Sequence, residues 1–328
     1  MPLFDLPIAD LRAYRPEVAE PADFDGFWAR TLAESRAIGG PVSVQPYEAF
    51  LTEFEVFDVT FPGFGGDPVR GWFVLPRGGD SLLPTVVEYN GYNGGRGFPH
   101  ERLAWASAGY AYFFMDTRGQ GSLWGSGGET ADPHGSGPST PGFMTRGIES
   151  PDSYFYRRVY TDAVRAIDAV RTLPRVDPDR IAVCGGSQGG GIAIAAAGLA
   201  DGLVAAMPEV PFLQHFERAV GLNDRDPYYE IVRYLSAHRG AEARTFATLS
   251  YFDGVNFAKR ASCPAIYSVG IMDPVCPPST VFASANSYAG GAEVVEYPFN
   301  EHEGGQGYHW RAQAQWLREV SGPRRVLT

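Results

Sequence analysis

Lysine is almost absent from this chain of 328 residues: of its 27 basic residues, only Lys259 is not an arginine. Schiff-base chemistry, a P-loop lysine and a Ser-Lys dyad would each have to use that one side chain. It lies in NFAKRAS, and no glycine-rich loop precedes it. We therefore expect none of these three mechanisms.

Cysteine and long apolar runs are also scarce. No apolar run approaches the roughly 20 residues that cross a bilayer, and MPLFDLPIADLRAY at the N-terminus lacks the basic stretch that opens a signal peptide. The cysteines cannot all pair and show no metal-ligand spacing; they are Cys184, Cys263 and Cys276. We expect a protein of the reducing cytoplasm, without a membrane partner.

Basic residues are also fewer than acidic ones, 27 against 38. The formal net charge is −11, and no Lys/Arg cluster is visible, so nucleic acid is not an expected partner and the substrate is expected to be neutral or polar. Apolar residues make up 44% of the chain, with no low-complexity tail, which is typical of a compact globule. The length suits one α/β domain with insertions.

The pattern of apolar residues predicts an α/β fold. Residues 1 to about 45 form an N-terminal extension with a helix in PADFDGFWARTLAESRA, and TEFEVFDVTF and VRGWFVLP alternate as an antiparallel hairpin. Short apolar runs then alternate with helical segments, which indicates a mostly parallel sheet with helices on both faces. The predicted strands are PTVVEYNG, YAYFFMDTRG, RIAVCGG, LVAAMPEVP, PAIYSVG and AEVVEYP; the predicted helices are PHERLAWASAG, FYRRVYTDAVRAIDAVRTL, GIAIAAAGLA and YHWRAQAQWLREV.

Two segments interrupt this alternation within what we interpret as a single domain over residues 1–328. Residues 119–155 are rich in Gly, Pro and Ser and predict a long loop, a feature that is often functional in compact domains. Residues from about 211 to 260 contain helical pieces and no obvious strand, which predicts a helical cap inserted between two strands.

The most informative motif is Gly185-Gly186-Ser187-Gln188-Gly189, a match to G-x-S-x-G between a predicted strand and a predicted helix. A nucleophile on such a sharp turn needs nearly bare neighbours, and it is exposed at a helix N-terminus that favours developing negative charge. A serine N-cap in a glycine-rich turn is the plainer alternative. The strand and helix context favours a nucleophile on an α/β-hydrolase fold.

A serine nucleophile needs a base and an acid, which follow it in the order Ser, Asp or Glu, His on this fold. His302 lies in a loop after the last predicted strand, where parallel sheets build their sites. His309 is expected to pack in the terminal helix. Asp273 follows the preceding strand and is the candidate acid; Glu301 and Glu303 are weaker candidates because adjacent side chains usually point apart.

Other glycine-rich or histidine-containing stretches do not add a cofactor or metal. RGQGSLWG is followed by more Gly, Pro and Ser instead of the helix that a dinucleotide loop requires. The two histidines of HEGGQGYH are too far apart for H-E-x-x-H, so no zinc site is expected. For the oxyanion hole, the expected donors are the backbone N–H groups of Gln188 and, in the loop GYNGGRG, Tyr92. Candidate walls of the substrate pocket are Gly91, Trp124 and Phe212.

Longer stretches of the chain resemble the acetyl xylan esterase / cephalosporin-C deacetylase family of α/β-hydrolases. The stretches are NGYNGGRG, DTRGQGSLW, PGFMTRGIESPDSYFYRRVYTDAVRAIDAV, GGSQGGG, SYFDGVNFAKRASCPAIYSVGIMDPVCPPST and HEGG, and together they span nearly the whole chain. Two details depart from the family: Asn90 stands where a histidine is more common, and GQGSLWG is less serine-rich.

The resemblance implies a serine esterase that deacetylates small sugars, xylo-oligosaccharides and cephalosporin-like molecules without a metal or cofactor. It assigns the triad to Ser187, Asp273 and His302 and the oxyanion hole to Tyr92 and Gln188, and it implies a cytoplasmic homohexamer. Two alternatives stay open on the sequence alone. One is a short-chain thioesterase or peptidase with the same triad; the other is a non-catalytic binding protein that kept the fold.

Overall fold

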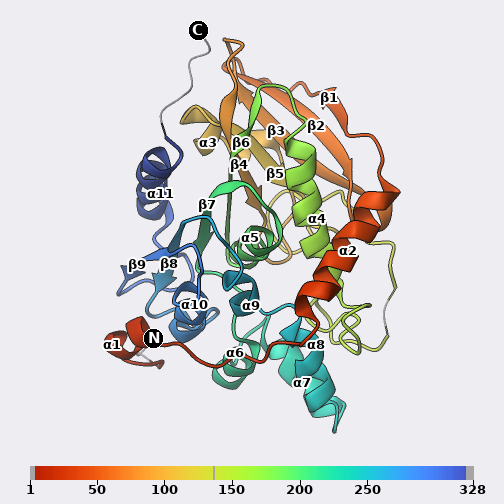
Figure 1. Cartoon of the computed structure of the whole chain (residues 1–328), viewed down its shortest axis with the longest axis vertical. Coiled ribbons are helices and arrows are strands. Elements are labelled where there is room, and N and C mark those ends of the chain that lie inside the picture. The colour runs from red at the N-terminus through yellow and green to blue at the C-terminus, as the bar shows by residue number, and fades with distance from the viewer. Residues whose placement is uncertain (1–3, 136, 323–328) are drawn as a thin grey trace.

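The computed structural model describes residues 4–135 and 137–322, and its strands form one nine-stranded sheet (Figure 1). Strands β1, β2, β3 and β5 pair with one another in antiparallel fashion, in that order. From β5 onwards, each pair of neighbouring strands in the sheet is parallel. This confirms the predicted α/β-hydrolase type of fold. In sheet order the strands are β1 (Ser43–Pro46), β2 (Phe54–Pro62), β3 (Pro68–Pro76), β5 (Ala111–Met115), β4 (Leu83–Tyr89), β6 (Val176–Gly186), β7 (Leu203–Glu209), β8 (Ala265–Gly270) and β9 (Ala292–Tyr297).

Strand β5 shows why the central strands are apolar throughout. All five of its residues are buried, and successive side chains enter opposite layers. Phe113 and Met115 pack in one core cluster, whereas Tyr112 and Phe114 pack in the other. A central strand covered on both faces has no solvent side on which polar residues could alternate.

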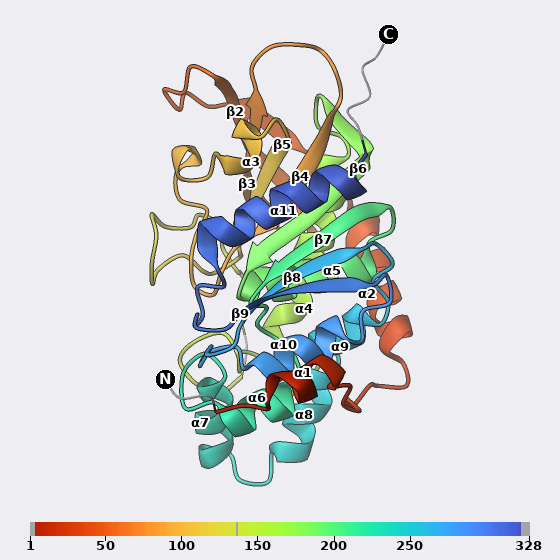
Figure 2. The same ribbon diagram turned by 90° about the vertical axis from the view of Figure 1, so that its left-hand side faces the viewer.

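Helices cover both faces of the sheet, as predicted (Figure 2). One core cluster includes residues of α4 (Phe155–Val170), α5 (Gln188–Leu199), α9 (Gly254–Ala258) and α10 (Pro278–Ala285), with α2 (Phe24–Ile38) packed outside α4. The other includes residues of α3 (Ala104–Ser107) and α11 (Gln306–Val320). Helix α5 is apolar on all sides, which suits its position between the sheet, α4 and α9.

The helix predicted in PHERLAWASAG is much shorter than expected. It is reduced to a single 3-10 turn, η2 (Pro99–Glu101), and the one-turn helix α3. Arg102, at φ −140° and ψ 69°, breaks the segment between them, because its guanidinium reaches back to Glu88 at 3.1 Å and lies 3.9 Å from the ring centroid of Phe114. A tertiary ion pair and a cation–π contact thus override local helix propensity.

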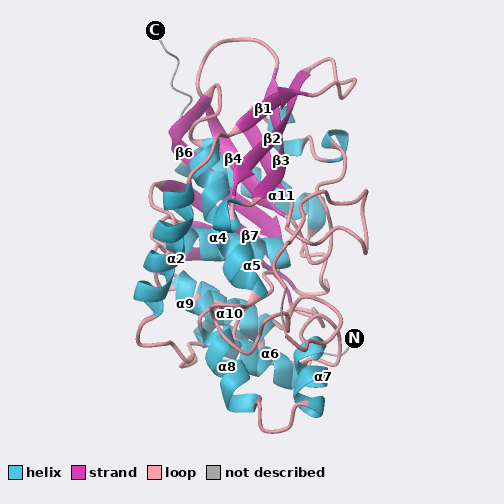
Figure 3. Cartoon of the chain, turned by 90° about the vertical axis from the view of Figure 1, so that its right-hand side faces the viewer, coloured by secondary structure: helices cyan, strands magenta, loops and turns pink. Residues whose placement is uncertain are grey.

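Between β7 and β8 the chain forms α6 (Phe216–Leu222), α7 (Tyr229–Ala237), α8 (Glu242–Ser250) and α9, and no strand, where a helical cap was predicted. Figure 3 shows α6, α7 and α8 together at one end of the molecule, and α9 packs against α5. The N-terminal segment runs along this end, with α1 (Ile8–Ala13) against α10. No helix in the described residues has the length and apolar character needed to cross a membrane.

The described part of the predicted loop, residues 119–155, contains no strand, and its one helical residue is Phe155, where α4 begins. Buried arginines fasten its first residues to the domain. Arg118, with its side chain fully buried, binds Asp162 of α4 at 2.5 Å and Asp67 at 2.9 Å, and Arg158 binds Asp132 at 2.7 Å. A paired, fully buried charge is costly to move, so this loop is held firmly where it passes the site.

Candidate active site

Ser187 lies on the sharp turn between β6 and α5. Its backbone, at φ 55° and ψ −117°, is in a region that non-glycine residues rarely occupy. The flanking glycines permit the turn: a Cβ added to Gly189 would stand 2.1 Å from the carbonyl oxygen of Tyr89, and one added to Gly185 would stand 2.5 Å from the backbone of Gly189. The turn is secured from β7, because the Ser187 N–H donates to the Glu209 carbonyl at 2.9 Å.

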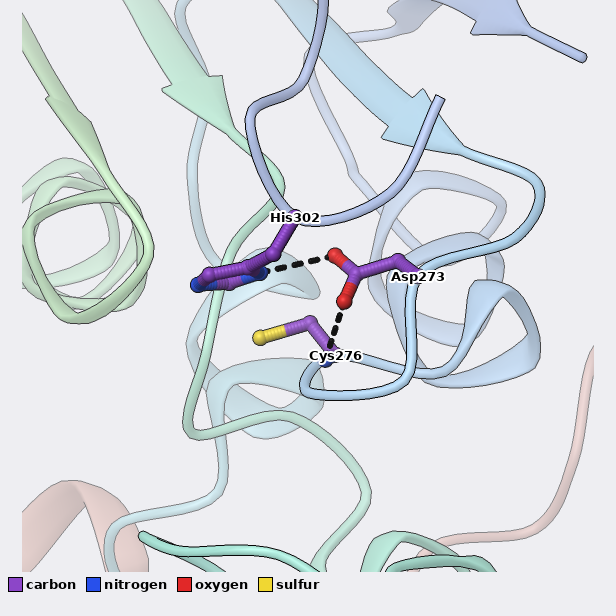
Figure 4. Close-up of side chains that lie close together, drawn as sticks. All are labelled: Asp273, Cys276 and His302. Carbon is purple, nitrogen blue, oxygen red and sulfur yellow. Dashed lines mark hydrogen bonds and ion pairs between the residues drawn. The ribbon is translucent and has the colours of Figure 1, made fainter. Parts of the chain in front are cut away.

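His302 and Asp273 meet Ser187 at the carboxyl edge of the sheet. The Nε2 atom of His302 is 2.9 Å from the Ser187 hydroxyl oxygen. Its Nδ1 atom is 2.8 Å from Asp273 Oδ2, a contact that Figure 4 shows. The Asp273 side chain is completely buried, whereas that of His302 keeps 29% exposure. The structure therefore brings the three predicted residues into one hydrogen-bonded chain, and the His302 side chain is reached by solvent.

The Asp273 carboxylate is oriented by the turn that follows β8. Its Oδ1 atom accepts the backbone N–H groups of Val275 at 2.8 Å and Cys276 at 2.9 Å, which leaves Oδ2 to face the imidazole. This explains why an aspartate stands in the turn before the prolines: the structural role and the contact with His302 use different oxygens of one side chain.

The loop that carries His302 is braced by its neighbouring carboxylate. Glu303 accepts the Glu301 N–H at 3.0 Å and binds the Asn300 side chain, and this hydrogen bond to Asn300 holds the pKa of Glu303 below its usual value. Asp273 makes the hydrogen bond to His302 Nδ1. His309 is fully buried in α11 beside Tyr297, and burial lowers the pKa of His309 to about 4. It packs as expected and does not reach the serine.

The two predicted oxyanion donors lie in segments that are bonded to each other. The Gln188 N–H is the first of α5, where a helix leaves its N–H groups unpaired. Within the described ranges, neither this N–H nor that of Tyr92 makes a hydrogen bond. The Gln188 side chain exchanges two 2.9 Å hydrogen bonds with Gln120, which also accepts the Asn93 N–H at 2.8 Å. The nucleophile turn and the Tyr92 loop are thereby held in one arrangement.

Asn90 braces the same loop. Its amide donates to the Gly95 carbonyl at 2.8 Å, and its side-chain oxygen accepts the Gly91 N–H at 2.9 Å. With 1% exposure it acts inside the loop, so the departure from the family's histidine at this position does not open a contact to solvent.

The predicted pocket residues surround Tyr92, although they do so differently. Trp124 is 44% exposed, donates from its indole to the Tyr92 carbonyl at 2.7 Å, and stands 3.2 Å from where a Cβ on Gly91 would lie. Phe212 is fully buried, with its ring centroid 6.1 Å from that of Tyr92. Trp124 and Gly91 thus keep some exposure beside Tyr92, whereas Phe212 packs against Tyr92 in the interior.

Two residues near the site were not singled out from the sequence. Cys276 is fully buried and its thiol contacts Ser187; burial raises the pKa of this thiol well above its usual value. Glu230 of α7 accepts a hydrogen bond from the Tyr92 hydroxyl at 2.5 Å, and burial raises the pKa of Glu230 to about 7. Nothing in YYEIVRY distinguishes this glutamate from a solvated helical residue, so only the fold reveals it.

In the part of the chain that the structure describes, one group has potential metal-ligand atoms gathered within 4.8 Å: Asp273, Cys276 and His302 (Figure 4). Both imidazole nitrogens are already engaged, one with Asp273 and one with Ser187. Coordination by His302 would break one of these bonds. The group is therefore better suited to proton transfer than to holding a resident metal.

Comparison with known proteins places this chain in a family. The family model described as acetyl xylan esterase (AXE1) matches residues 1–320. The chain is 28% identical over 304 residues to the acetyl esterase Axe7A of Xylanibacter ruminicola, covering 88% of this chain and 65% of that protein. It thus spans less than two-thirds of that relative's length.

Two solved structures are similar over nearly the whole chain. The acetyl xylan esterase from Paenibacillus sp. R4 is 40% identical, with a TM-score of 0.90 over 96% of this chain and 100% of that one. Acetyl xylan esterase 1 from Thermoanaerobacterium sp. JW/SL YS485 is 31% identical, with a TM-score of 0.89 over 97% and 100%. A Pyrococcus horikoshii acylaminoacyl peptidase, 16% identical with a TM-score of 0.61 over 85% of this chain and 44% of its own, shares the fold.

Proposed function

This chain belongs to the acetyl xylan esterase family of carboxylic ester hydrolases, and on that premise we propose that it removes acetyl groups from small acetylated carbohydrates by a Ser-His-Asp mechanism. The observation that carries the proposal is the hydrogen-bonded chain from Ser187 through His302 to Asp273, with links of 2.9 Å and 2.8 Å. A hydroxyl, an imidazole and a buried carboxylate in this order form the arrangement that activates a serine for acyl transfer.

In the proposed first step, His302 Nε2 takes the proton from the Ser187 hydroxyl as its oxygen bonds to the acetyl carbonyl carbon. The carbonyl electron pair moves onto the oxygen, where the Tyr92 and Gln188 N–H groups stabilise the negative charge. His302 then gives the proton to the sugar oxygen as the ester C–O bond breaks, leaving acetyl-Ser187. Throughout, Asp273 holds the imidazole in the tautomer with its proton on Nδ1.

The second step repeats the first with water. His302 takes a proton from the water whose oxygen attacks the acetyl-enzyme, and it gives that proton to Ser187 as the bond from the acetyl carbon to the Ser187 oxygen breaks. The product leaves as acetic acid, which releases its remaining proton to the solvent and becomes acetate. One imidazole carries the transferred proton in both steps, so this cycle uses no metal or cofactor.

The substrate class is proposed from the relatives. Two similar structures are named as acetyl xylan esterases, which favours acetylated xylose and xylo-oligosaccharides. Cephalosporin C, whose acetoxymethyl group presents the same acetyl ester, is a further proposed substrate. We also propose a cytoplasmic enzyme that assembles as a homohexamer, to be tested by cell fractionation and by light scattering.

The test is an acetate-release screen on acetylated xylose, acetylated xylo-oligosaccharides and cephalosporin C, with butyryl esters, acetyl thioesters and peptides measured alongside. We expect turnover on the acetyl esters that exceeds turnover on the others. A preference for thioesters or peptides would replace the proposal with another hydrolase activity on this fold. Failure of Ser187 to react with a fluorophosphonate would indicate a binding protein instead.

A further inference from the structure

The Tyr92 side chain, not only its backbone, is fastened inside the protein. Its hydroxyl donates to Glu230 Oε1 at 2.5 Å and accepts the Phe143 N–H at 2.6 Å. Burial, together with the neighbouring Glu230 carboxylate, raises the pKa of Tyr92 well above its usual value, so the hydroxyl keeps the proton that it donates. Tyr92 is proposed to act through its backbone N–H, and the hydroxyl at the other end of its side chain makes two hydrogen bonds.

Glu230 makes a second bond from the same carboxylate. Its Oε2 atom accepts the Met144 N–H at 3.0 Å, and the residue is only 3% exposed. The nearby Arg233 is paired with Asp226 at 2.6 Å. The Glu230 carboxylate is thus buried with two neutral donors, the Tyr92 hydroxyl and the Met144 N–H. Burial of a carboxylate on neutral donors costs free energy, so an apolar residue would be expected at this position if its role were packing alone.

The shape of the surrounding loop is fitted to this carboxylate. Gly142 has φ +124°, and a Cβ added there would stand 2.1–2.2 Å from the carboxyl carbon and both carboxyl oxygens of Glu230. We call the five residues Tyr92, Gly142, Phe143, Met144 and Glu230 the cap anchor. They join three segments: the Tyr92 loop, the loop of residues 119–155 and the cap helix α7.

The Tyr92 side chain, which has little conformational freedom, connects the cap anchor to the backbone of Tyr92. Only two side-chain torsions separate the Tyr92 ring from its Cα, and the ring lies against Phe143 at 5.6 Å and Phe212 at 6.1 Å between centroids. Trp124 holds the Tyr92 carbonyl at 2.7 Å. The Tyr92 N–H shares a peptide plane with the Gly91 carbonyl, which accepts the Gly94 N–H at 3.2 Å. The side chain of Tyr92 and the peptides on both sides of it are therefore all held.

We infer that Glu230 is a positioning residue for the oxyanion hole: by holding the Tyr92 hydroxyl, this cap residue aims the Tyr92 N–H at the oxyanion. The inference rests on the proposed function, because it assumes that Tyr92 supplies an oxyanion donor. Its consequence is that the cap helix contributes to the rate of the chemical step and not only to the shape of the entrance.

The test compares Glu230→Gln with Glu149→Gln. Both changes neutralise a carboxylate that joins the loop of residues 119–155 to the cap, but Glu149 pairs with Arg244 at 3.1 Å on the exposed surface. We expect Glu230→Gln to lower kcat about tenfold to hundredfold, less than the roughly 10²- to 10³-fold loss of a whole oxyanion donor. Its KM should change less than about threefold, and Glu149→Gln should match the wild type.

A transition-state mimic separates positioning from mere stabilisation. Trifluoroacetone adds to a catalytic serine as an oxyanion hemiketal, so its inhibition constant should rise in parallel with the loss in kcat/KM. The affinity for deacetylated sugar should not change. Tyr92→Phe, which removes only the hydroxyl, should reproduce the effect, and adding it to Glu230→Gln should cost little more.

Two results would overturn the inference. One is wild-type kcat in both Glu230→Gln and Tyr92→Phe; the other is a loss of stability with no change in trifluoroacetone affinity. If Glu230→Gln does not fold, Tyr92→Phe alone decides by the same two measurements. If the wild-type protein releases no acetate from any ester, the proposed function fails and the inference falls with it.

Discussion

The triad and the cap anchor are built in different ways. Ser187, Asp273 and His302 each follow a parallel strand, β6, β8 and β9, so one rigid sheet positions all three. The cap anchor takes its residues from a loop, a second loop and a cap helix, with only Tyr92 close to a strand end. The sheet holds the proposed reacting groups, whereas contacts between insertions hold the residue that we propose as an oxyanion donor.

This difference implies different sensitivities. A change at Ser187 removes its hydroxyl but leaves the turn in place, because the turn is held by backbone contacts such as the Ser187 N–H to the Glu209 carbonyl. A change within the cap anchor disturbs buried hydrogen bonds that join separate segments, so activity and stability should fall together. The predictions below separate the two regions on that basis.

Replacing the nucleophile should have the largest effect on activity and almost none on folding. Ser187→Ala removes the hydroxyl that bonds His302, and we expect turnover of an aryl acetate to fall roughly 10⁴- to 10⁶-fold. The midpoint of denaturant unfolding should stay close to that of the wild type, since alanine keeps the backbone of the turn. Initial rates and urea unfolding of the same samples measure both quantities.

The matched control is Ser236→Ala, at an exposed serine of α7, which should retain full activity. Hydrolysis by Ser187→Ala at a rate near the wild type would refute the assignment of the nucleophile.

The same contrast explains how much of the site the sequence could predict. Ser187, Asp273 and His302 follow from a position rule, because each comes shortly after an apolar strand and the carboxyl ends of parallel strands share an edge. Glu230 could not be found in this way. Its role depends on where α7 lies relative to a loop some 90 residues earlier, and local patterns carry no information about that distance.

The secondary structure was also predictable only where it is set by local sequence patterns. The strands and the long helices were predictable because hydrophobic periodicity over many residues is set by the layers that bury them. The segment PHERLAWASAG was not, because the contacts of Arg102 with Glu88 and Phe114 interrupt the expected helix. Phe212 was expected in a pocket wall but is fully buried behind Tyr92, a difference that depends on the placement of the cap.

Gly142→Ala should break the cap anchor without removing any of its polar groups. The new methyl group would displace the Glu230 carboxylate from its donors, and the backbone at φ +124° disfavours a side chain. We expect a loss of about 1–3 kcal/mol in the free energy of unfolding and a fall in kcat of about tenfold. Urea unfolding and acetate-release kinetics measure the two effects.

Gly135→Ala, in the same loop, serves as the control, because nothing lies within 4 Å of its added Cβ. Wild-type activity together with reduced stability in Gly142→Ala would show that the anchor supports folding alone and would contradict its role in the oxyanion hole.

The smallest predicted effect is a pH dependence of stability that arises in the cap anchor. Burial raises the pKa of Glu230 from 4.5 to about 7, so the unfolded chain loses this proton at a lower pH than the folded one. The stability that this group contributes is therefore complete below about pH 4.5 and is lost as pH rises through about 7. Between pH 5 and 8 the wild type should lose about 2 kcal/mol relative to Glu230→Gln, which cannot ionise.

Urea unfolding of both proteins at several pH values isolates this contribution, since all other titrating groups are common to the pair. His309 has the opposite pH dependence, because burial lowers its pKa from 6.5 to about 4. The stability that the neutral, buried imidazole contributes is lost as pH falls from about 6.5 towards 4. Because His309 is present in both proteins, its contribution cancels, and the difference between wild type and Glu230→Gln should grow only as the pH rises towards and past the raised pKa of Glu230. A difference that stayed constant from pH 5 to 8 would mean that the Glu230 carboxylate is not desolvated, and the contrast between the sheet-borne triad and the buried anchor would lose its electrostatic basis.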